Sequence, residues 1–162
     1  MATLNPYLNF NGNTEEAFNF YKSVFGGEFA SLQRFGDTPF CDQMGEADKQ
    51  KIMHISLPIL QDTILMATDT VESMGQKLVV GNNFSLCISP GSKEEATRFF
   101  NDLSAGGQVT MPLEKAFWGA YFGMATDKFG IQWMVNYDEN QVSQNGTEQK
   151  KNDMELQDQE AV

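Results

Sequence analysis

The chain carries one arrangement of strand, helix and strands twice, at an offset of 79 residues. In each copy a short apolar stretch runs into a Gly turn, two consecutive Glu residues follow, and an amphipathic helix then ends at two consecutive Gly residues. The matched pairs are Gly12 and Gly91, Glu15 and Glu94, Glu16 and Glu95, Ala17 and Ala96, and Phe20 and Phe99. An order shared over this length predicts two related halves of one fold.

The helix of each half is predicted from the spacing of its apolar residues. The first runs from Asn13 or Thr14 to Phe25 and the second from Ser92 to Leu103, because their apolar side chains fall on one helical face. Two Gly residues follow each helix, which is a common C-terminal stop. The paired acids at positions 15, 16, 94 and 95 lie in the first turns, where negative charge suits the helix dipole, so we interpret them as structural.

Strand-like runs flank both helices. They are Tyr7–Phe10, Phe29–Phe35, Ile52–Leu57 and Thr63–Thr68 in the first half, and Phe84–Ser89, Gln108–Pro112, Gly119–Ala125 and Ile131–Tyr137 in the second. Each half therefore reads β-α-β-β-β, and we predict an α/β (α+β) fold of two βαβββ modules at about residues 1–72 and 80–137. Two curved half-sheets of this kind can face each other across a cleft, which is a default binding site.

Two connections carry further expectations. The polar segment Gly36–Gln50 interrupts the first half and is a candidate mobile loop over a site. The run Asp127-Lys128-Phe129-Gly130 is predicted to form a hairpin turn, with the Asp127 side chain bonding the backbone and Gly130 taking a positive φ.

Length and charge exclude several classes of function. The chain has 162 residues, the size of one ordinary domain, and a net charge of −11 that disfavours nucleic acid or an anionic membrane as a partner. No apolar run is long enough to cross a bilayer and no basic, apolar leader opens the chain, so we expect a cytoplasmic protein. Cys41 and Cys87 belong to no Cys-x-x-Cys or Cys/His cluster, which argues against a structural zinc site.

Residues 138–162 form an acidic polar tail. Seven acids and two lysines give it a net charge of −5 (2 − 7), and it has no aromatic residue. A segment of this composition cannot bury enough apolar surface to offset the entropy of ordering, so we predict that it is disordered. An interaction module that binds a partner through this tail is one hypothesis for the function.

A set of local motifs extends over about residues 4–137. They are Pro6-Tyr7-Leu8, Phe10, Gly12-Asn13, Glu15-Glu16-Ala17, Phe20-Tyr21, Phe25-Gly26, Ile52, His54, Leu57, Leu65-Met66, Asp69, Phe117-Trp118-Gly119-Ala120, Phe122-Gly123, Thr126-Asp127-Lys128-Phe129-Gly130, Trp133-Met134 and Asn136. Together with the repeated order, they resemble the PhnB-like group of the vicinal oxygen chelate superfamily, which includes glyoxalase I, bleomycin-resistance proteins and extradiol dioxygenases. The resemblance implies a glyoxalase-like fold, binding of a small molecule and a homodimer.

The resemblance also implies where a divalent metal ion would bind in the metal-dependent members, at the first and last strands of each half. Strand-to-strand alignment puts those positions at Pro6, Met66, Asn83 and Met134, with Ser85 reached by a small shift of register. Apart from an amide oxygen at Asn83, none of these four suits a hard divalent cation, and Ser85 would still not complete a set of four ligands. We therefore predict no metal and no other cofactor, and a metal-dependent glyoxalase-type lyase or isomerase is the alternative.

Some members of the group carry a name borrowed from demethylubiquinone methyltransferases. A Rossmann-type methyltransferase would have a Gly-rich turn after its first strand, above a parallel sheet. Here both Gly pairs follow helices, so the sequence gives that chemistry no support.

Four residues are the candidate ligand contacts. His54 is the single histidine, and its imidazole could act as a base or as a hydrogen-bonding group in the cleft. Trp118, Tyr121 and Trp133 could stack on a planar or apolar ligand. For each of the four, the competing interpretation is an ordinary strand or core residue. Glu114 is the carboxylate nearest in sequence to Trp118, and we interpret it as a solvated loop acid.

Nucleophilic catalysis finds no matching pattern. The sequence has no Gly-x-Ser-x-Gly elbow, and neither cysteine has the histidine as a neighbour in the chain. The sequence therefore predicts a PhnB-like small-molecule-binding protein whose reaction is unknown, with His54 as the candidate catalytic residue.

Overall fold

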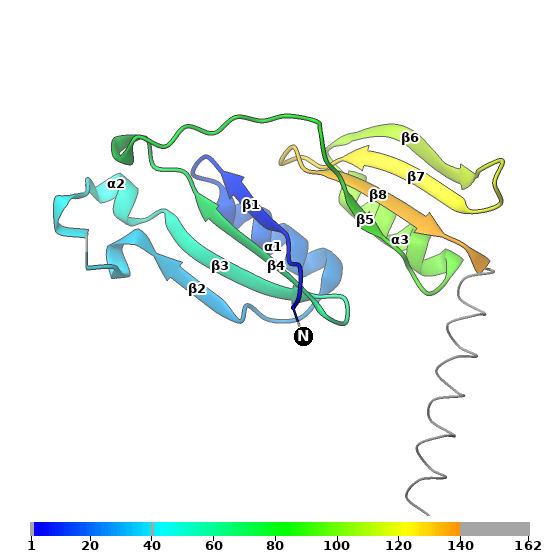
Figure 1. The fold of residues 1–162 in the computed structure, drawn as a ribbon, viewed down its shortest axis with the longest axis horizontal. Coiled ribbons are helices and arrows are strands. Elements are labelled where there is room, and N and C mark those ends of the chain that lie inside the picture. Colours follow the sequence, from blue (N-terminus) through cyan, green and yellow to red (C-terminus); the bar gives the residue numbers. More distant parts are fainter. Residues whose placement is uncertain (1, 40, 140–162) are drawn as a thin grey trace, which may run out of the picture. The chain divides into compact units, whose positions relative to one another are not determined.

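The computed structural model describes residues 2–39 and 41–139. They form two compact units that divide after Gly81 (Figure 1). Each unit has one four-stranded sheet and one long helix, so the predicted α+β fold with two βαβββ modules is confirmed. In the described part of the chain, no helix is long and apolar enough to span a bilayer. From residue 140 onward, the predicted tail lies outside the described residues.

The first unit places its first strand beside its last. Its main elements are β1 (Tyr7–Phe10), α1 (Thr14–Phe25), β2 (Ser31–Arg34), β3 (Ile52–Ile59) and β4 (Thr63–Asp69). The sheet order is β1-β4-β3-β2, in which β1 and β4 are parallel and the other neighbours antiparallel. Helix α1 packs on β3 and β4 and completely buries Ala17, Phe18 and Tyr21, which form much of the core.

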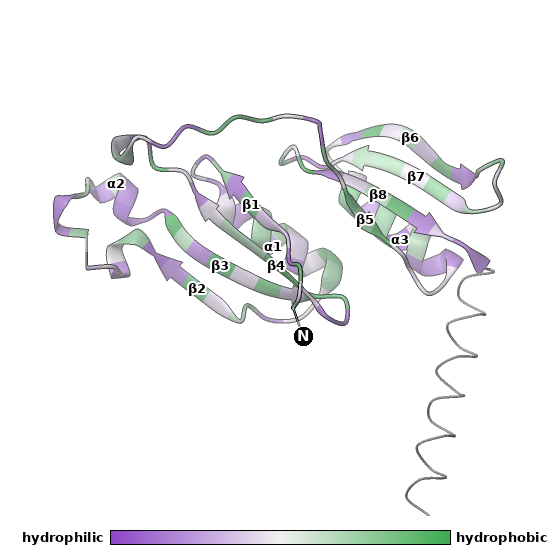
Figure 2. Cartoon of the chain, in the orientation of Figure 1, coloured by the Kyte–Doolittle hydropathy of each residue, from purple (hydrophilic) through white to green (hydrophobic). Residues whose placement is uncertain are grey.

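The segment predicted as a mobile loop is folded into short helices, η1 (Phe35–Asp37), η2 (Cys41–Gln43) and α2 (Glu46–Lys49). The Arg34 guanidinium ties the end of this segment to α1, since it donates to both carboxylate oxygens of Glu15 at 2.9 and 2.8 Å and to the Gln50 carbonyl at 2.8 Å. Glu15 is thus an ion-pair partner as well as a helix-start charge. Figure 2 shows hydrophilic residues gathered over α2 and the turns beside it. A role as a cover over a site stays a prediction.

The second unit repeats the topology of the first. Its elements are β5 (Leu86–Ile88), α3 (Lys93–Ser104), β6 (Gln108–Lys115), β7 (Tyr121–Thr126) and β8 (Gln132–Tyr137). The sheet order is β5-β8-β7-β6, and β5 and β8 are the parallel pair. Helix α3 packs on β6, β7 and β8, where Ala96, Phe100, Ala125 and Val135 form a buried cluster.

Every predicted strand and helix has a counterpart, but several ends differ. The predicted strand Phe29–Phe35 shortens to Ser31–Arg34, because Phe35 turns into the core as the first residue of η1. Strand β6 continues past Pro112 to Lys115, and its register against β7 shifts on both sides of Met111. An edge strand with such irregularities tolerates a proline, which explains why the strand does not end there. The short helix η3 (Glu72–Met74) was not predicted.

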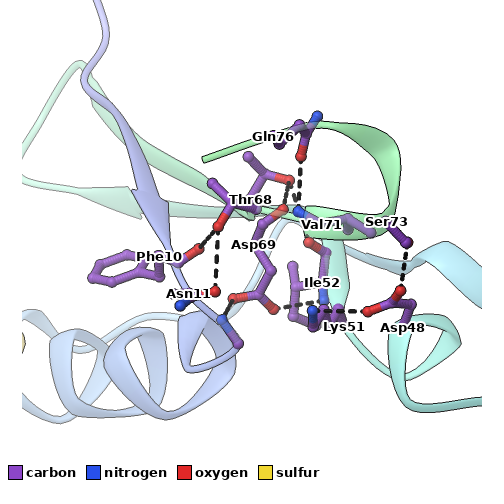
Figure 3. Close-up of polar contacts among 12 residues, drawn as sticks. Phe10, Asn11, Asp48, Lys51, Ile52, Thr68, Asp69, Val71, Ser73 and Gln76 are labelled. Atoms are coloured by element: carbon purple, nitrogen blue, oxygen red, sulfur yellow. Dashed lines mark hydrogen bonds and ion pairs between the residues drawn. The ribbon is translucent and has the colours of Figure 1, made fainter. Parts of the chain in front are cut away.

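One buried carboxylate joins the start of α1 to the sheet of the first unit (Figure 3). Asp69, 2% exposed at the end of β4, accepts hydrogen bonds from the Gly12 and Thr14 amides at 2.9 and 3.1 Å. It also accepts from the Thr14 hydroxyl at 2.7 Å and from the Ile52 amide at 2.8 Å. Asn13, the N-cap residue, makes no capping bond with its own side chain, so Asp69 supplies the cap from a distant strand.

Asp127 has a comparable role in the second unit. It is 3% exposed, and its Oδ1 accepts hydrogen bonds from the amides of Phe129 and Ile131 at 2.8 and 3.0 Å. Its Oδ2 accepts from the indole N–H of Trp133 at 2.8 Å. Gly130 has a φ of 87°, so the predicted turn is confirmed. The Asp127 carboxylate in this turn also orients the buried Trp133.

Replacing Asp69 by Asn should lower the free energy of unfolding by about 2–4 kcal/mol, because one amide oxygen cannot replace two oxygens that share four hydrogen bonds. Denaturant unfolding followed by circular dichroism measures the change. Asp62→Asn, exposed in the β3–β4 turn, is the charge-matched control and should stay within about 0.5 kcal/mol of the unsubstituted chain. Equal stabilities of the two variants would contradict the assigned role.

Asp48 should make stability depend on pH in the acid range. Hydrogen bonds from Lys51 at 2.8 Å and Ser73 at 2.6 Å hold the pKa of Asp48 below its ordinary value of 3.8 (Figure 3). A carboxylate with a lowered pKa stabilises the fold above its ordinary value, and this contribution is lost as the pH falls through the lowered one. Asp48→Asn should therefore flatten the loss of stability below about pH 4, measured by thermal unfolding across a pH series. An unchanged acid limb would rule the contribution out.

Candidate functional site

Each sheet has one face covered by its own helix, and the opposite face is here called the open face. Strand residues alternate between the two sides, so burial identifies them. In β4, Leu65 and Ala67 are buried under α1 and Met66 lies on the open face. In β8, Val135 is buried under α3 and Met134 lies on the open face. The residues that a ligand could contact are therefore those of the open faces.

The open face of the first unit carries the histidine among polar neighbours. His54 of β3 lies opposite Gln33 of β2, and the adjacent row contains Tyr7, Met66 and Ser56. The Tyr7 hydroxyl lies 3.2 Å from His54 Nδ1, and the two ring centroids are 5.9 Å apart. Tyr7 is 46% exposed and His54 is half-buried, so both side chains border solvent on this face.

The contact between Tyr7 and His54 orients the imidazole. Burial raises the pKa of Tyr7, so its phenol stays protonated at neutral pH. A protonated phenol can donate to Nδ1, and that arrangement leaves the Nε2 hydrogen for an acceptor on a ligand. The pair is therefore suited to hydrogen-bond a polar group that rests on the sheet.

The open face of the second unit carries an aromatic cluster. Trp118, in the β6–β7 connection, contacts Phe122 edge-on with ring centroids 5.6 Å apart, and contacts Phe117 with centroids 4.9 Å apart. Phe117 is 98% exposed and Trp118 is 53% exposed. Phe122 precedes the buried Gly123 and points away from α3, so the cluster borders the open face. Glu114 pairs with Phe122 and is an exposed strand residue, which corrects its interpretation as a loop acid.

The other two predicted aromatic contacts lie on the covered side of the second sheet. Trp133 is 2% exposed and its indole N–H is bound by Asp127. Tyr121 packs against the core beneath α3, with the Lys93 ammonium 4.7 Å from the ring centroid. Ligand contact by these two rings stays a prediction, and the function proposed below does not depend on it.

The sequence did not reveal which residues contact His54 and Trp118, the other two candidates. Tyr7 is 47 positions from His54 along the chain, and Phe122 stands out in the sequence only as part of a motif. The parallel pairing of β1 with β4 is what brings Tyr7 close to β3. The order of elements in a βαβββ unit could have indicated this contact, because pairing of the first and last strands places β1 and β3 on either side of β4.

The strand register also revises the positions expected for metal ligands. Pro6 lies before β1, and both Asn83 and Ser85 lie before β5, so none of the three is the first-strand partner of the last strand. The observed pairs are Tyr7 with Met66 and Cys87 with Met134. A phenol, a thiol and two thioethers do not fit a hard divalent cation. Across residues 2–39 and 41–139, no three His, Cys, Asp or Glu side chains are grouped so that they could hold a metal ion.

Two such units define the fold of the glyoxalase/bleomycin resistance proteins. A glyoxalase-related enzyme from Fulvimarina pelagi has this fold, with a TM-score of 0.55 at 17% identity over 85% of this chain and 89% of that one. The chain itself belongs to the family described as 3-demethylubiquinone-9 3-methyltransferase, whose model matches residues 2–136. It is a PhnB-like member of the vicinal oxygen chelate superfamily.

Relatives match this chain over nearly their whole lengths. Protein YjdN of Escherichia coli (strain K12) is 30% identical over 149 residues, which cover 87% of this chain and 99% of YjdN. The crystal structure of protein PA1353 from Pseudomonas aeruginosa is 40% identical, with a TM-score of 0.75, and covers 85% of this chain and 98% of its own. The similarity therefore includes both units.

The two tryptophans should respond differently to a soluble quencher, because Trp118 is 53% exposed and Trp133 is 2% exposed. Trp118→Phe should leave blue-shifted emission that acrylamide quenches poorly. Phe84→Leu, a similarly exposed ring outside the cluster, is the control and should leave quenching unchanged. Strong quenching of the Trp118→Phe protein would contradict the placement of Trp133 in the core.

Proposed function

We propose that this PhnB-like protein binds small molecules on the open faces of its sheets, a hydrogen-bond acceptor at His54 and Tyr7 of the first unit and an apolar or planar body at the aromatic cluster of the second. The observation that carries the proposal is the pairing of His54 with Tyr7 at 3.2 Å on an open face. A histidine in a solvated strand has no need of a fixed orientation, whereas a histidine that recognises a ligand does. The reaction, if the ligand is transformed, is not specified by this pair.

The aromatic cluster supports the binding of an apolar or planar body on the second unit. Trp118 contacts both Phe117 and Phe122, and Phe117 and Trp118 are largely exposed, so the three rings form an apolar surface on the second unit. Exposed aromatic patches of this kind usually mark a binding surface. Met124, next along β7 on the same face as Phe122, adds a flexible apolar side chain that can adapt to different ligand shapes.

The proposal does not include the methyl transfer in the family's description. Enzymes that bind a nucleotide-like cofactor commonly use free amides at a helix N-terminus that follows a strand of a parallel sheet. At α1 the amides of Gly12 and Thr14 are taken by Asp69, and at α3 the Glu95 amide is taken by the Ser92 hydroxyl at 3.1 Å. Each sheet has one parallel pair among antiparallel ones, so neither has the doubly wound arrangement.

The expected homodimer is part of the proposal. It is supported by apolar side chains left exposed in this chain, among them Val79 at 82%, Val80 at 73% and Phe117 at 98%. Val79 and Val80 lie between η3 and β5, and Figure 2 shows hydrophobic residues in the segment that joins these two elements. A second copy of the chain could cover them. Cytoplasmic location stays a prediction.

Binding of Nile red, a neutral planar dye, tests the proposal. The full chain should bind it saturably, and Trp118→Ala and His54→Ala should each weaken binding about fivefold or more, as expected when a ring or a polar contact at a binding surface is removed. Tyr7→Phe should have a smaller effect, because it keeps the ring and removes the hydroxyl.

Asn19→Ala and Asn101→Ala, both exposed on the outer sides of α1 and α3, are the matched controls and should bind the dye like the unsubstituted chain. Dye fluorescence titrations give the dissociation constants, and circular dichroism verifies that each variant is folded. Unsaturable binding, or equal binding by the site and control variants, would overturn the proposal.

A further inference from the structure

One row across the open face of the second sheet consists of sulfur side chains. Cys87 of β5 lies opposite Met134 of β8, Met134 lies opposite Met124 of β7, and Met124 lies opposite Met111 of β6. These are all the methionines in residues 82–139, the described part of the second unit, together with one of the two cysteines. A row of four soft donors on one face is not required by packing, because the core lies on the other side of the sheet.

The spacing of the row suits a metal ion held between neighbouring strands. Adjacent strands lie about 4.8 Å apart, and directly opposed side chains have Cβ atoms about 4.5–5.5 Å apart. Two sulfur atoms on opposite sides of one ion are separated by about 4.6 Å when each bond is about 2.3 Å, the length of a zinc–thiolate bond. Met side chains have three rotatable bonds and can adjust their sulfur atoms to such a distance.

The chemistry of the row selects a soft ion. Thiolate and thioether ligands favour soft ions such as Cu(I) over hard divalent ions such as Mg²⁺, Ca²⁺ and Mn²⁺, which take oxygen ligands, and a site with two thioethers and one thiolate favours Cu(I) most. Strand β5 pairs only with β8. On the open face of β8, the residues on either side of Met134 are the uncharged Gln132 and Asn136. The nearest open-face carboxylate in the sheet, Glu114, pairs with Phe122 and so lies outside the row.

The row is accessible from solvent. Cys87 is exposed and is a free thiol on the edge strand, Met111 is 44% exposed, and the two methionines between them are half-buried. A partly exposed row of this kind can admit an ion while its central thioethers are shielded from bulk water.

We propose that Cys87, Met134 and Met124 bind one soft monovalent metal ion, Cu(I) or its analogue Ag(I), on the open face of the second sheet. The Cys87 thiol loses its proton to solvent as the sulfur–metal bond forms, and the two thioether sulfurs donate lone pairs without any change of protonation. No oxidation or reduction takes place. The site shares Met124 with the apolar surface proposed above, but it needs neither His54 nor the aromatic rings.

The proton released on binding makes the affinity depend on pH. The thiolate is the form that binds a metal, so the ion must displace the proton of the Cys87 thiol. The affinity of the chain for the ion should therefore increase with pH until the thiol is deprotonated.

Calorimetric titration of the full chain with silver nitrate tests the site, and the Cys41→Ser protein is the parent because Cys41 is the other free thiol. The parent should bind one Ag(I) tightly, and adding Cys87→Ser should abolish this binding. Met134→Leu and Met124→Leu, which conserve volume but remove the thioether, should each weaken binding about tenfold or more. Met66→Leu, on the first sheet, is the matched control and should have no effect.

Binding that is lost with Cys87→Ser but unchanged by both Met→Leu variants would show a lone reactive thiol and overturn the site. Tight binding that survives Cys87→Ser would overturn it as well. If the parent binds no Ag(I), the methionines serve only as adaptable apolar surface and the inference is wrong. Nile red binding by the Cys87→Ser protein should match that of the parent, so failure here is distinguishable from failure of the proposed function.

Discussion

The Asp69 carboxylate is the interaction on which the first unit depends. It lies at the end of the last strand and caps the first helix, so it joins the two ends of the βαβββ unit at one buried point. Its bond to the Ile52 amide adds the start of β3 to the same point. With these three elements fixed, α1 can cover only one face of the sheet, and the other face is left to carry His54 and Tyr7.

The second unit reaches the same result with a different contact. Its helix is capped locally, by the Ser92 hydroxyl and the Glu95 carboxylate, and the buried acid Asp127 lies at the β7–β8 turn instead. There it holds the indole of Trp133 on the covered side of the sheet. Each unit thus has one buried aspartate that joins separate parts of the chain on the covered side of its sheet.

The sequence was sufficient for the elements and insufficient for the contacts between them. The helices and strands could be predicted because apolar spacing and Gly stops are local signals. The cap by Asp69 could not, because its partners Gly12 and Thr14 are more than fifty positions away and give no local sign of it. Trp118 and Trp133 could not be told apart for the same reason, since only the register and the turn at Asp127 decide which ring is buried.

The pairing of first and last strands explains how the fold can persist while its chemistry changes. The register depends on backbone hydrogen bonds and on the buried side chains, so the open-face residues at the paired positions are free to vary without altering it. In this chain they are Tyr7 with Met66 and Cys87 with Met134. A phenol, a thiol and two thioethers at these positions do not fit a hard divalent cation, and they give each open face a different chemistry. The backbone therefore identifies the class, and the side chains of the open faces determine the chemistry that each face offers.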